Sequence, residues 1–264
     1  MAAYFDSGFS VRQPMWHGEG NVLADYPTDW DDARVKAGLE WEPKAVPSWT
    51  RQPITAKGMP DGAISLGDGT CMVASTKSKT IVRDDTLAEL GPVSQGHGLV
   101  YHRNMGEIIE AILGAGAKFE TAGSCKEGAN VWALAYLDEP EAIAGDDTET
   151  LPFLALLNAH DGSGACKLTF TSVRVVCWNT YNQASLEGER TGRQFVFRHT
   201  ANVLERIGEA KLALSGLRDE AAEWKTLAES LHKIRANDAA LQMFVQTFIP
   251  EPAADIISDR VRAN

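Results

Sequence analysis

The chain has 264 residues, with 36 Asp or Glu against 25 Lys or Arg, and its net charge is −11. This acidic balance excludes a uniformly basic nucleic-acid coat protein, although a local basic groove remains compatible with it. Hydrophobic residues make up 44% of the sequence, which is enough for a core and excludes global disorder. No apolar run approaches about 18 residues, so no membrane-spanning segment is predicted.

Residues 1–69 predict an extended N-terminal arm, because they combine many prolines and glycines with aromatic residues. The tryptophan and tyrosine residues among them are Tyr4, Trp16, Tyr26, Trp30, Trp41 and Trp49. One short helix is expected at 29–37, with Thr28 as its cap. The rings would anchor the arm to a body, since they bury a large area at low entropy cost. Alternatively, they would form stacking platforms for nucleic-acid bases.

Residues 70–198 predict an α+β core domain with a small antiparallel sheet, and residues 199–264 predict a helical C-terminal region. Residues 70–83 are expected to form a strand or a hairpin, and two further strands are expected at 118–122 and 130–137. Residues 194–198 are expected to form a short strand or an extended link. Asn104 is expected to cap a helix over 106–113. Residues 84–103 and the acidic stretch 138–150 are expected to be loops.

The segment 151–185 predicts the unit around which this core is organised. Two β-rich runs, 153–158 and 167–174, flank a turn containing Asp161-Gly162-Ser163-Gly164. Aspartate and glycine tolerate the backbone angles of a tight reversal, so the pattern predicts a β-hairpin. The alternation then gives way to a helix-compatible pattern over 175–184, which predicts a strand–turn–strand–helix unit.

Motifs of known enzymes are absent: the sequence has no nucleotide-binding GxxxxGK[ST], no HExxH, no GxSxG and no dinucleotide fingerprint. His97 and His102 lack a third ligand at metal-binding spacing. The sequence therefore predicts no catalytic residue, cofactor or metal. An unrecognised enzyme site around His17, Glu19, His160 and Asp161 remains an open alternative.

The four cysteines, Cys71, Cys125, Cys166 and Cys177, are far apart and form no CxxC pair. The N-terminus lacks the basic-then-apolar order of a signal peptide. Reduced thiols in the cytoplasm are typical of this pattern, so we expect a cytoplasmic protein.

Basic residues cluster after the hairpin. Residues 161–211 hold seven Lys or Arg and five Asp or Glu, a balance of +2 in a chain of −11. Such residues could converge on one groove, with amide side chains adding hydrogen bonds to phosphates or base edges. The candidate nucleic-acid-binding residues are Lys167, Arg174, Asn179, Asn182, Arg190, Arg193 and Arg198. Alternatively, the arginines pair with nearby glutamates and Asn179 caps the helix.

Several segments resemble, in the same order, a family of uncharacterised phage/plasmid-like proteins with a domain of unknown function. They are WHGEG near the start, ARVKAGLEWEP, FETAGSCKEGANVWALA, TSVRVVCWNTYNQA and FRHTANVLERIGEA. The resemblance covers roughly residues 15–215. It implies an origin in phages or mobile elements and a location in the host-cell cytoplasm. It implies no activity and no catalytic residues.

The order of strands, hairpin and long helix also resembles, more loosely, the core of phage single-strand annealing proteins. That resemblance implies a groove for single-stranded DNA between hairpin and helix, and subunits assembled into rings or filaments. We therefore expect a single-stranded DNA-binding protein of recombination or replication that promotes annealing. The alternative is a protein-binding factor that modulates a host process without enzymatic activity, which the aromatic arm and the acidic composition favour.

Overall fold

The computed structural model describes residues 5–15, 18–114, 117–136, 153–192 and 194–206, together with residues 230, 237–239 and 242–243. The chain divides into two compact units: Met1–Glu141 with Thr150–Ala221, and Ala142–Glu149 with Ala222–Asn264. All the named helices and strands belong to the first unit. Within the described residues, no helix has the length and apolar character needed to cross a bilayer.

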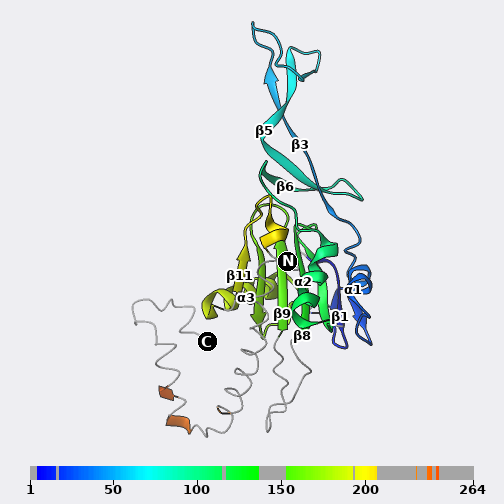
Figure 1. Ribbon diagram of the computed structural model, residues 1–264, viewed down its shortest axis with the longest axis vertical. Helices are drawn as coiled ribbons and strands as arrows, with labels where there is room; N and C mark the ends of the chain where they lie inside the picture. Colours follow the sequence, from blue (N-terminus) through cyan, green and yellow to red (C-terminus); the bar gives the residue numbers. More distant parts are fainter. Residues whose placement is uncertain are drawn as a thin grey trace, which may run out of the picture. The chain divides into compact units, whose positions relative to one another are not determined.

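Seven strands form one sheet in the order β11-β10-β9-β8-β7-β1-β2 (Figure 1). Their bounds are β1 Phe5–Val11, β2 Asn21–Leu23, β7 Phe119–Cys125, β8 Asn130–Tyr136, β9 Phe153–Ala159, β10 Cys166–Thr171 and β11 Gln194–Phe197. Neighbouring strands are antiparallel, except for the parallel pair β1 and β2. The predicted α+β class with an antiparallel sheet is confirmed, and the sheet is larger than expected.

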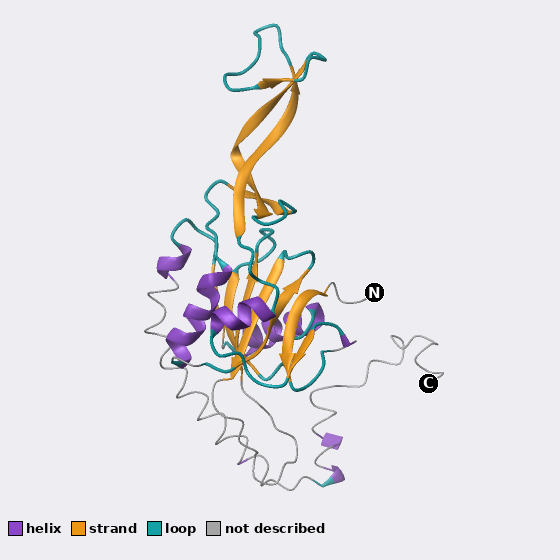
Figure 2. Cartoon of the chain, turned by 90° about the vertical axis from the view of Figure 1, so that its right-hand side faces the viewer, coloured by secondary structure: helices purple, strands orange, loops and turns teal. Residues whose placement is uncertain are grey.

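The centre of the sheet is covered on both faces. Every residue of β8 and β9 is buried. Because successive side chains of a strand point to opposite faces, Val131 and Ala133 enter one hydrophobic cluster, whereas Trp132 and Leu134 enter another. The first cluster includes residues of α1 (Trp30–Lys36) and α2 (His102–Leu113), and the second includes residues of α3 (Trp178–Thr191). The unit therefore has three layers, helix–sheet–helix (Figure 2).

The predicted strand–turn–strand–helix unit is present as β9, β10 and α3. In the turn, Asp161 Oδ1 accepts the backbone N–H of Ser163 at 2.8 Å, and Gly162 has a φ of 76°. The second strand ends earlier than predicted and the helix begins later. Thr180 Oγ1 accepts the backbone N–H groups of Val176 and Cys177 at 2.9 and 3.0 Å, and this capping arrangement sets the start of α3.

The segment predicted as an extended arm is largely built into the fold. It supplies β1 and β2 to the seven-stranded sheet and α1 to one helical layer. Trp30 and Trp41 are each 4% exposed and belong to the first hydrophobic cluster. Trp30 Nε1 also donates to the backbone carbonyl of His102 at 2.8 Å. These two rings are anchors rather than stacking platforms. Trp16 lies outside the described residues.

A second sheet is built from β3 (Pro43–Pro53), β4 (Ile64–Ser65), β5 (Thr70–Arg83) and β6 (Glu89–Ser94). Its order is β3-β5-β4, and β6 also pairs with β5 (Figure 1). We call residues 43–83, which comprise β3, β5 and the chain between them, the ribbon. The predicted loop 84–103 contains β6, whose internal Pro92 obscures the strand pattern.

Helix α2 begins two residues before the predicted cap, Asn104. Its first N–H groups are satisfied by a distant carboxylate: Glu42 accepts the N–H of His102 at 2.7 Å and that of Arg103 at 3.0 Å. A capping residue 60 positions away leaves no local pattern in the sequence. The predicted helices of 199–264 and the acidic loop 138–150 lie almost entirely outside the described residues.

Candidate nucleic-acid interface

A cleft with a volume of about 490 Å³ lies beside α3, and we call it the α3 cleft. It is lined by Ser172, Val173, Asn179, Asn182, Gln183, Leu186, Glu187 and Arg190. Most of these residues lie three or four positions apart, so they share one face of the helix. The volume is within the range of about 300–1,000 Å³ that is typical of ligand pockets.

Helix α3 is held close to the sheet by a glycine. A Cβ atom on Gly188 would lie 1.9 Å from Thr169 Oγ1 of β10, so only glycine permits this approach. The preceding residue, Glu187, accepts hydrogen bonds from the hydroxyls of Thr171 and Ser172. These contacts fix the loop after β10 against α3 and so define one wall of the α3 cleft.

Three of the predicted binding residues share the α3 cleft: Asn179, Asn182 and Arg190. Asn179 and Arg190 are exposed, and neither side chain bonds another residue of the described chain. Asn182 is half-buried, and its Nδ2 donates to the Trp178 carbonyl at 2.9 Å. The cleft therefore presents an amide and a guanidinium, groups suited to base edges and to a phosphate.

Arg174 lies apart from these groups because its guanidinium is committed inside the fold. Its Nε donates to Glu120 Oε1 at 2.7 Å, and its Nη2 donates to the Val11 carbonyl at 2.9 Å. The Arg174 side chain is 22% exposed and that of Glu120 only 5%. The pair ties the loop before α3 to β7 and to the end of β1.

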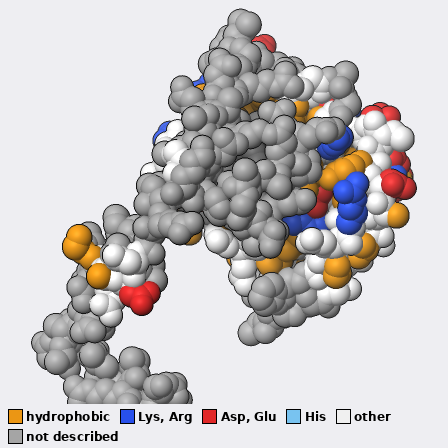
Figure 3. Space-filling model, turned by 90° about the horizontal axis from the view of Figure 1, so that it is seen from below, with side chains coloured by type: hydrophobic (Ala, Val, Ile, Leu, Met, Phe, Trp, Pro, Cys, Tyr) orange, Lys and Arg blue, Asp and Glu red, His pale blue; other side chains and the backbone are white. Residues whose placement is uncertain are grey.

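Lys167 is also engaged within the fold. It lies on β10, and its Nζ donates to Ser185 Oγ of α3 at 2.7 Å. Arg198 is exposed immediately after β11, and Arg193 lies outside the described residues. On the face seen in Figure 3, Lys and Arg side chains lie among hydrophobic and acidic ones, without one continuous basic patch over the described part of the chain. The structure therefore brings three of the seven candidates together.

Sequence reasoning missed the apolar part of this surface, in particular Val173 and Leu186. Leu186 is 58% exposed, and Gln183 beside it is exposed as well. A helical stripe of Asn179, Gln183, Leu186 and Arg190 would have revealed Leu186, whereas Val173 precedes the helix. Leu186 was missed because the predicted helix ended at 184, before half of the stripe.

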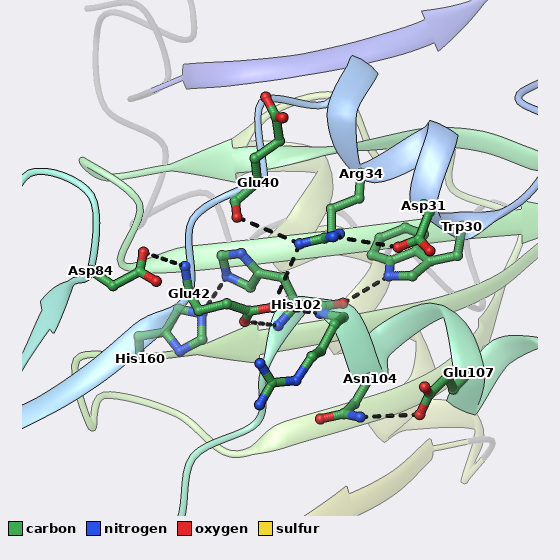
Figure 4. Close-up of polar contacts among 11 residues, drawn as sticks. Trp30, Asp31, Arg34, Glu40, Glu42, Asp84, His102, Asn104, Glu107 and His160 are labelled. Carbon is green, nitrogen blue, oxygen red and sulfur yellow. Dashed lines mark hydrogen bonds and ion pairs between the residues drawn. The ribbon is translucent and has the colours of Figure 1, made fainter.

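A second polar cluster surrounds two buried histidines (Figure 4). The Nε2 atoms of His102 and His160 are 2.9 Å apart, and the two residues are 0% and 1% exposed. Such a hydrogen bond requires one protonated and one unprotonated nitrogen, which two neutral rings provide. Trp41 packs its ring against both histidines, with centroids 4.3 and 6.0 Å away. The pair is inaccessible to a substrate, so it supports no enzyme site at His160.

Burial lowers the pKa of His102 to about 4. Burial also holds the pKa of His160 well below its ordinary value, and the neighbouring His102 adds a smaller effect in the same direction. Burial of the carboxylate raises the pKa of Glu42, against the opposing hydrogen bonds from the N–H groups of Arg103 and His102. Within the described ranges, no group of three or more His, Cys, Asp or Glu residues is placed to hold a metal ion.

The histidine pair predicts loss of stability in mild acid. Because the folded-state pKa values lie below the unfolded value of about 6.5, protonation favours the unfolded chain. The stabilisation is present above pH 6.5 and decreases as the pH falls toward the value of about 4 for His102. We expect the urea concentration at the unfolding midpoint to decrease as the pH is lowered from 7 to 5. The raised pKa of Glu42 acts in the opposite direction and makes this decrease smaller.

The control for this prediction is His160→Gln, which removes one titrating ring and should reduce the slope of the midpoint against pH. His97 and His199, whose rings stack at 4.4 Å, also have lowered pKa values and leave part of the slope in place. A wild-type midpoint that is constant from pH 7 to pH 5 would contradict the prediction.

Comparison with known proteins gives one family match. The family described as "Domain of unknown function (DUF932)" matches residues 89–262, which include α2, β7–β11 and α3. No curated protein and no solved structure matches the chain. The match covers the α3 cleft but leaves out β1–β5 and α1.

Proposed function

This chain belongs to the DUF932 family, and because that description names no activity, we propose from the α3 cleft that the protein binds single-stranded DNA and promotes the annealing of complementary strands. The observation that carries the proposal is the stripe on α3. It combines unbonded polar groups of Asn179 and Arg190 with the exposed apolar side chain of Leu186. Polar edges and apolar faces are the two features of an unstacked base.

The charge of the site defines the strength of binding that we propose. Arg190 is the one cation that lines the α3 cleft within the described residues, and Glu187 lies on the same face. Each phosphate neutralised on a single strand contributes about −0.7 to the slope of log affinity against log salt. Binding at the α3 cleft should therefore be modest and only weakly dependent on salt.

The test is fluorescence anisotropy of a labelled oligonucleotide, both single-stranded and as a duplex, at low and physiological salt. The Asn179→Ala/Arg190→Gln variant should bind the single strand at least about tenfold more weakly, equivalent to about 1.4 kcal/mol. It should also slow the annealing of complementary strands. Both side chains are exposed, so the fold should persist.

Glu189→Gln is the matched control, because Glu189 is exposed on α3 but does not line the α3 cleft. This variant should bind the single strand as the wild type does. Absence of single-strand binding by the wild-type chain at low salt would overturn the proposal, as would unchanged affinity of the Asn179→Ala/Arg190→Gln variant.

A second candidate function is that of a protein-binding factor without enzymatic activity. The exposed Leu186, next to the half-buried Val173, favours it, because an apolar side chain of a partner would fit between them. Under this alternative, Leu186→Ser would abolish capture of a single stoichiometric partner, whereas the wild-type chain would not bind DNA.

A further inference from the structure

The ribbon carries much of its length outside the hydrophobic core. In β3 only Pro43 is buried, and in β5 only Cys71, Ile81 and Val82 are buried. Its distal half is held by the pairing of β3 with β5, from Trp49↔Ala74 to Pro53↔Thr70. The pair β3 and β5 runs along the whole ribbon, joined by the two-residue β4 at Cys71 and Met72 and by β6 at 78–82. A ribbon that is this exposed presents side chains on both of its faces.

The outer edge of the ribbon is not suited to accept another strand. Strand β3 pairs only with β5 and contains Pro43, Pro47 and Pro53, which have no backbone N–H to donate. A register shift between Pro47 and Trp49 interrupts the edge further. Prolines and irregularities at an edge strand oppose strand addition. A partner of the ribbon is therefore recognised through side chains.

The ribbon is basic, whereas the rest of the chain is strongly acidic. Residues 43–83 contain six Lys or Arg and two Asp or Glu, a balance of +4, which leaves −15 for the remainder of a chain of −11. Arg51 pairs with Asp68, and Arg83 pairs with Asp85. Lys44, Lys57 and Lys77 are exposed and have no acidic partner in the described part of the chain.

The distal end of the ribbon, residues 54–69, exposes several apolar side chains beside the charged Lys57, Asp61 and Asp68. Met59, Ile64 and Leu66 are 43%, 55% and 45% exposed, and Pro60 follows Met59. Proteins that bend DNA from its minor groove often insert apolar side chains between base steps. A ribbon with exposed lysines along its length and apolar side chains at its distal end is therefore complementary to a nucleic-acid duplex, which has phosphates on its outside and stacked bases inside.

We propose that the ribbon is an arm that lies in a groove of double-stranded DNA. β-Ribbons bind B-form DNA in either groove, and its major groove, about 12 Å wide, admits a two-stranded ribbon, whereas that of A-form RNA is too narrow to be read by side chains. A single strand would instead require several stacking platforms, and Trp49 is the one aromatic residue in 43–83. The lysines contact phosphates, and the apolar side chains at the distal end contact the base steps.

The ribbon is a surface separate from the α3 cleft, and its proposed role does not depend on the cleft. An annealing protein encounters both a single strand and the duplex that it forms. The α3 cleft is proposed for the former and the ribbon for the latter. Because the two surfaces share no residue, their variants distinguish the two proposals.

The test compares the wild type with Lys44→Gln/Lys57→Gln/Lys77→Gln by anisotropy on a labelled DNA duplex over a range of salt. Each phosphate contact on B-form DNA contributes about −0.9 to the slope of log affinity against log salt. The variant should therefore bind the duplex more weakly, with a slope that is smaller by up to about 3. Its single-strand affinity should change much less, and thermal unfolding should match the wild type because the three side chains are exposed.

Asp61→Asn is the matched control, since Asp61 is exposed on the same ribbon and carries the opposite charge. It should leave duplex affinity equal or slightly higher.

Met59→Ser/Ile64→Ser/Leu66→Ser should reduce the bending of an end-labelled duplex, measured by energy transfer, and leave the salt slope unchanged. Light scattering is recorded for each variant. No salt-dependent duplex binding by the wild type, or an unchanged slope in the lysine variant, would overturn the proposal. The proposal would also be overturned by a ribbon variant that has a lower molecular mass in solution than the wild type but the same duplex affinity. That result would show that the ribbon contacts a second copy of the chain.

Discussion

The Arg174→Ala substitution should lower the free energy of unfolding by about 3–5 kcal/mol, as expected when one partner of a buried ion pair is removed. Glu120 would keep a buried carboxylate without its cation. Burial already raises the pKa of Glu120, and Arg174 opposes that shift. The carbonyl of Val11 would also lose the hydrogen bond from the guanidinium. The measurement is urea denaturation at pH 7.

The control is the double variant Arg174→Met/Glu120→Gln, which removes both charges and retains much of the volume. It should recover a large part of the lost stability, since the main cost of the single variant is the unpaired carboxylate. A single variant within about 1 kcal/mol of the wild type would contradict this account. Substitution of Arg174 is consequently a poor test of DNA binding, because it perturbs the fold.

Gly106→Ala should destabilise the protein, although alanine is favoured over glycine in a helix by about 1 kcal/mol. A Cβ atom on Gly106 would lie 1.8 Å from Trp30 Cγ and 2.2 Å from Trp30 Cβ. Trp30 is buried between α1 and α2, and its indole N–H bonds the His102 carbonyl. Forcing it aside should cost at least about 1–3 kcal/mol, the usual range for an overpacked core.

The measurement for Gly106→Ala is the thermal or urea midpoint, with Trp fluorescence as a second readout of the displaced indole. Gly96→Ala is the control, because nothing lies within 4 Å of a Cβ atom at Gly96 and its φ is not positive. This control should stay within about 0.5 kcal/mol of the wild type. Equal midpoints for the two variants would show that the helices α1 and α2 can separate without cost.

Elements whose signals are local could be predicted from the sequence. Strand β5 has the predicted bounds, and β9, the turn and β10 follow from alternation and from Asp161 with Gly162. Elements that depend on distant partners could not. The start of α2 is set by Glu42, and β6 is recognisable only through its pairing with β5. Neither contact has a counterpart in the neighbouring sequence.

The candidate site shows the same division. Asn179, Asn182 and Arg190 share one helical face, and their spacing alone predicts that they lie together. Arg174 is close to them in sequence, but its partner Glu120 is 54 positions away. A count of charges therefore assigned to a groove a guanidinium that stabilises the core. The same count, taken over residues 43–83, gives +4, against +2 over residues 161–211.

The pairing of β1 with β7 has a consequence for the order of folding. Ser7 on β1 bonds Ser124 on β7, 117 positions later in the chain. At a synthesis rate of about 5–20 residues per second, β1 leaves the ribosome roughly 6–23 s before its partner. During that time the buried side chains of Phe9 and Val11 have no sheet to join. The N-terminal strand is thus exposed to chaperones in a nascent chain for longer than strands β7, β8 and β9, which pair with their neighbours in sequence.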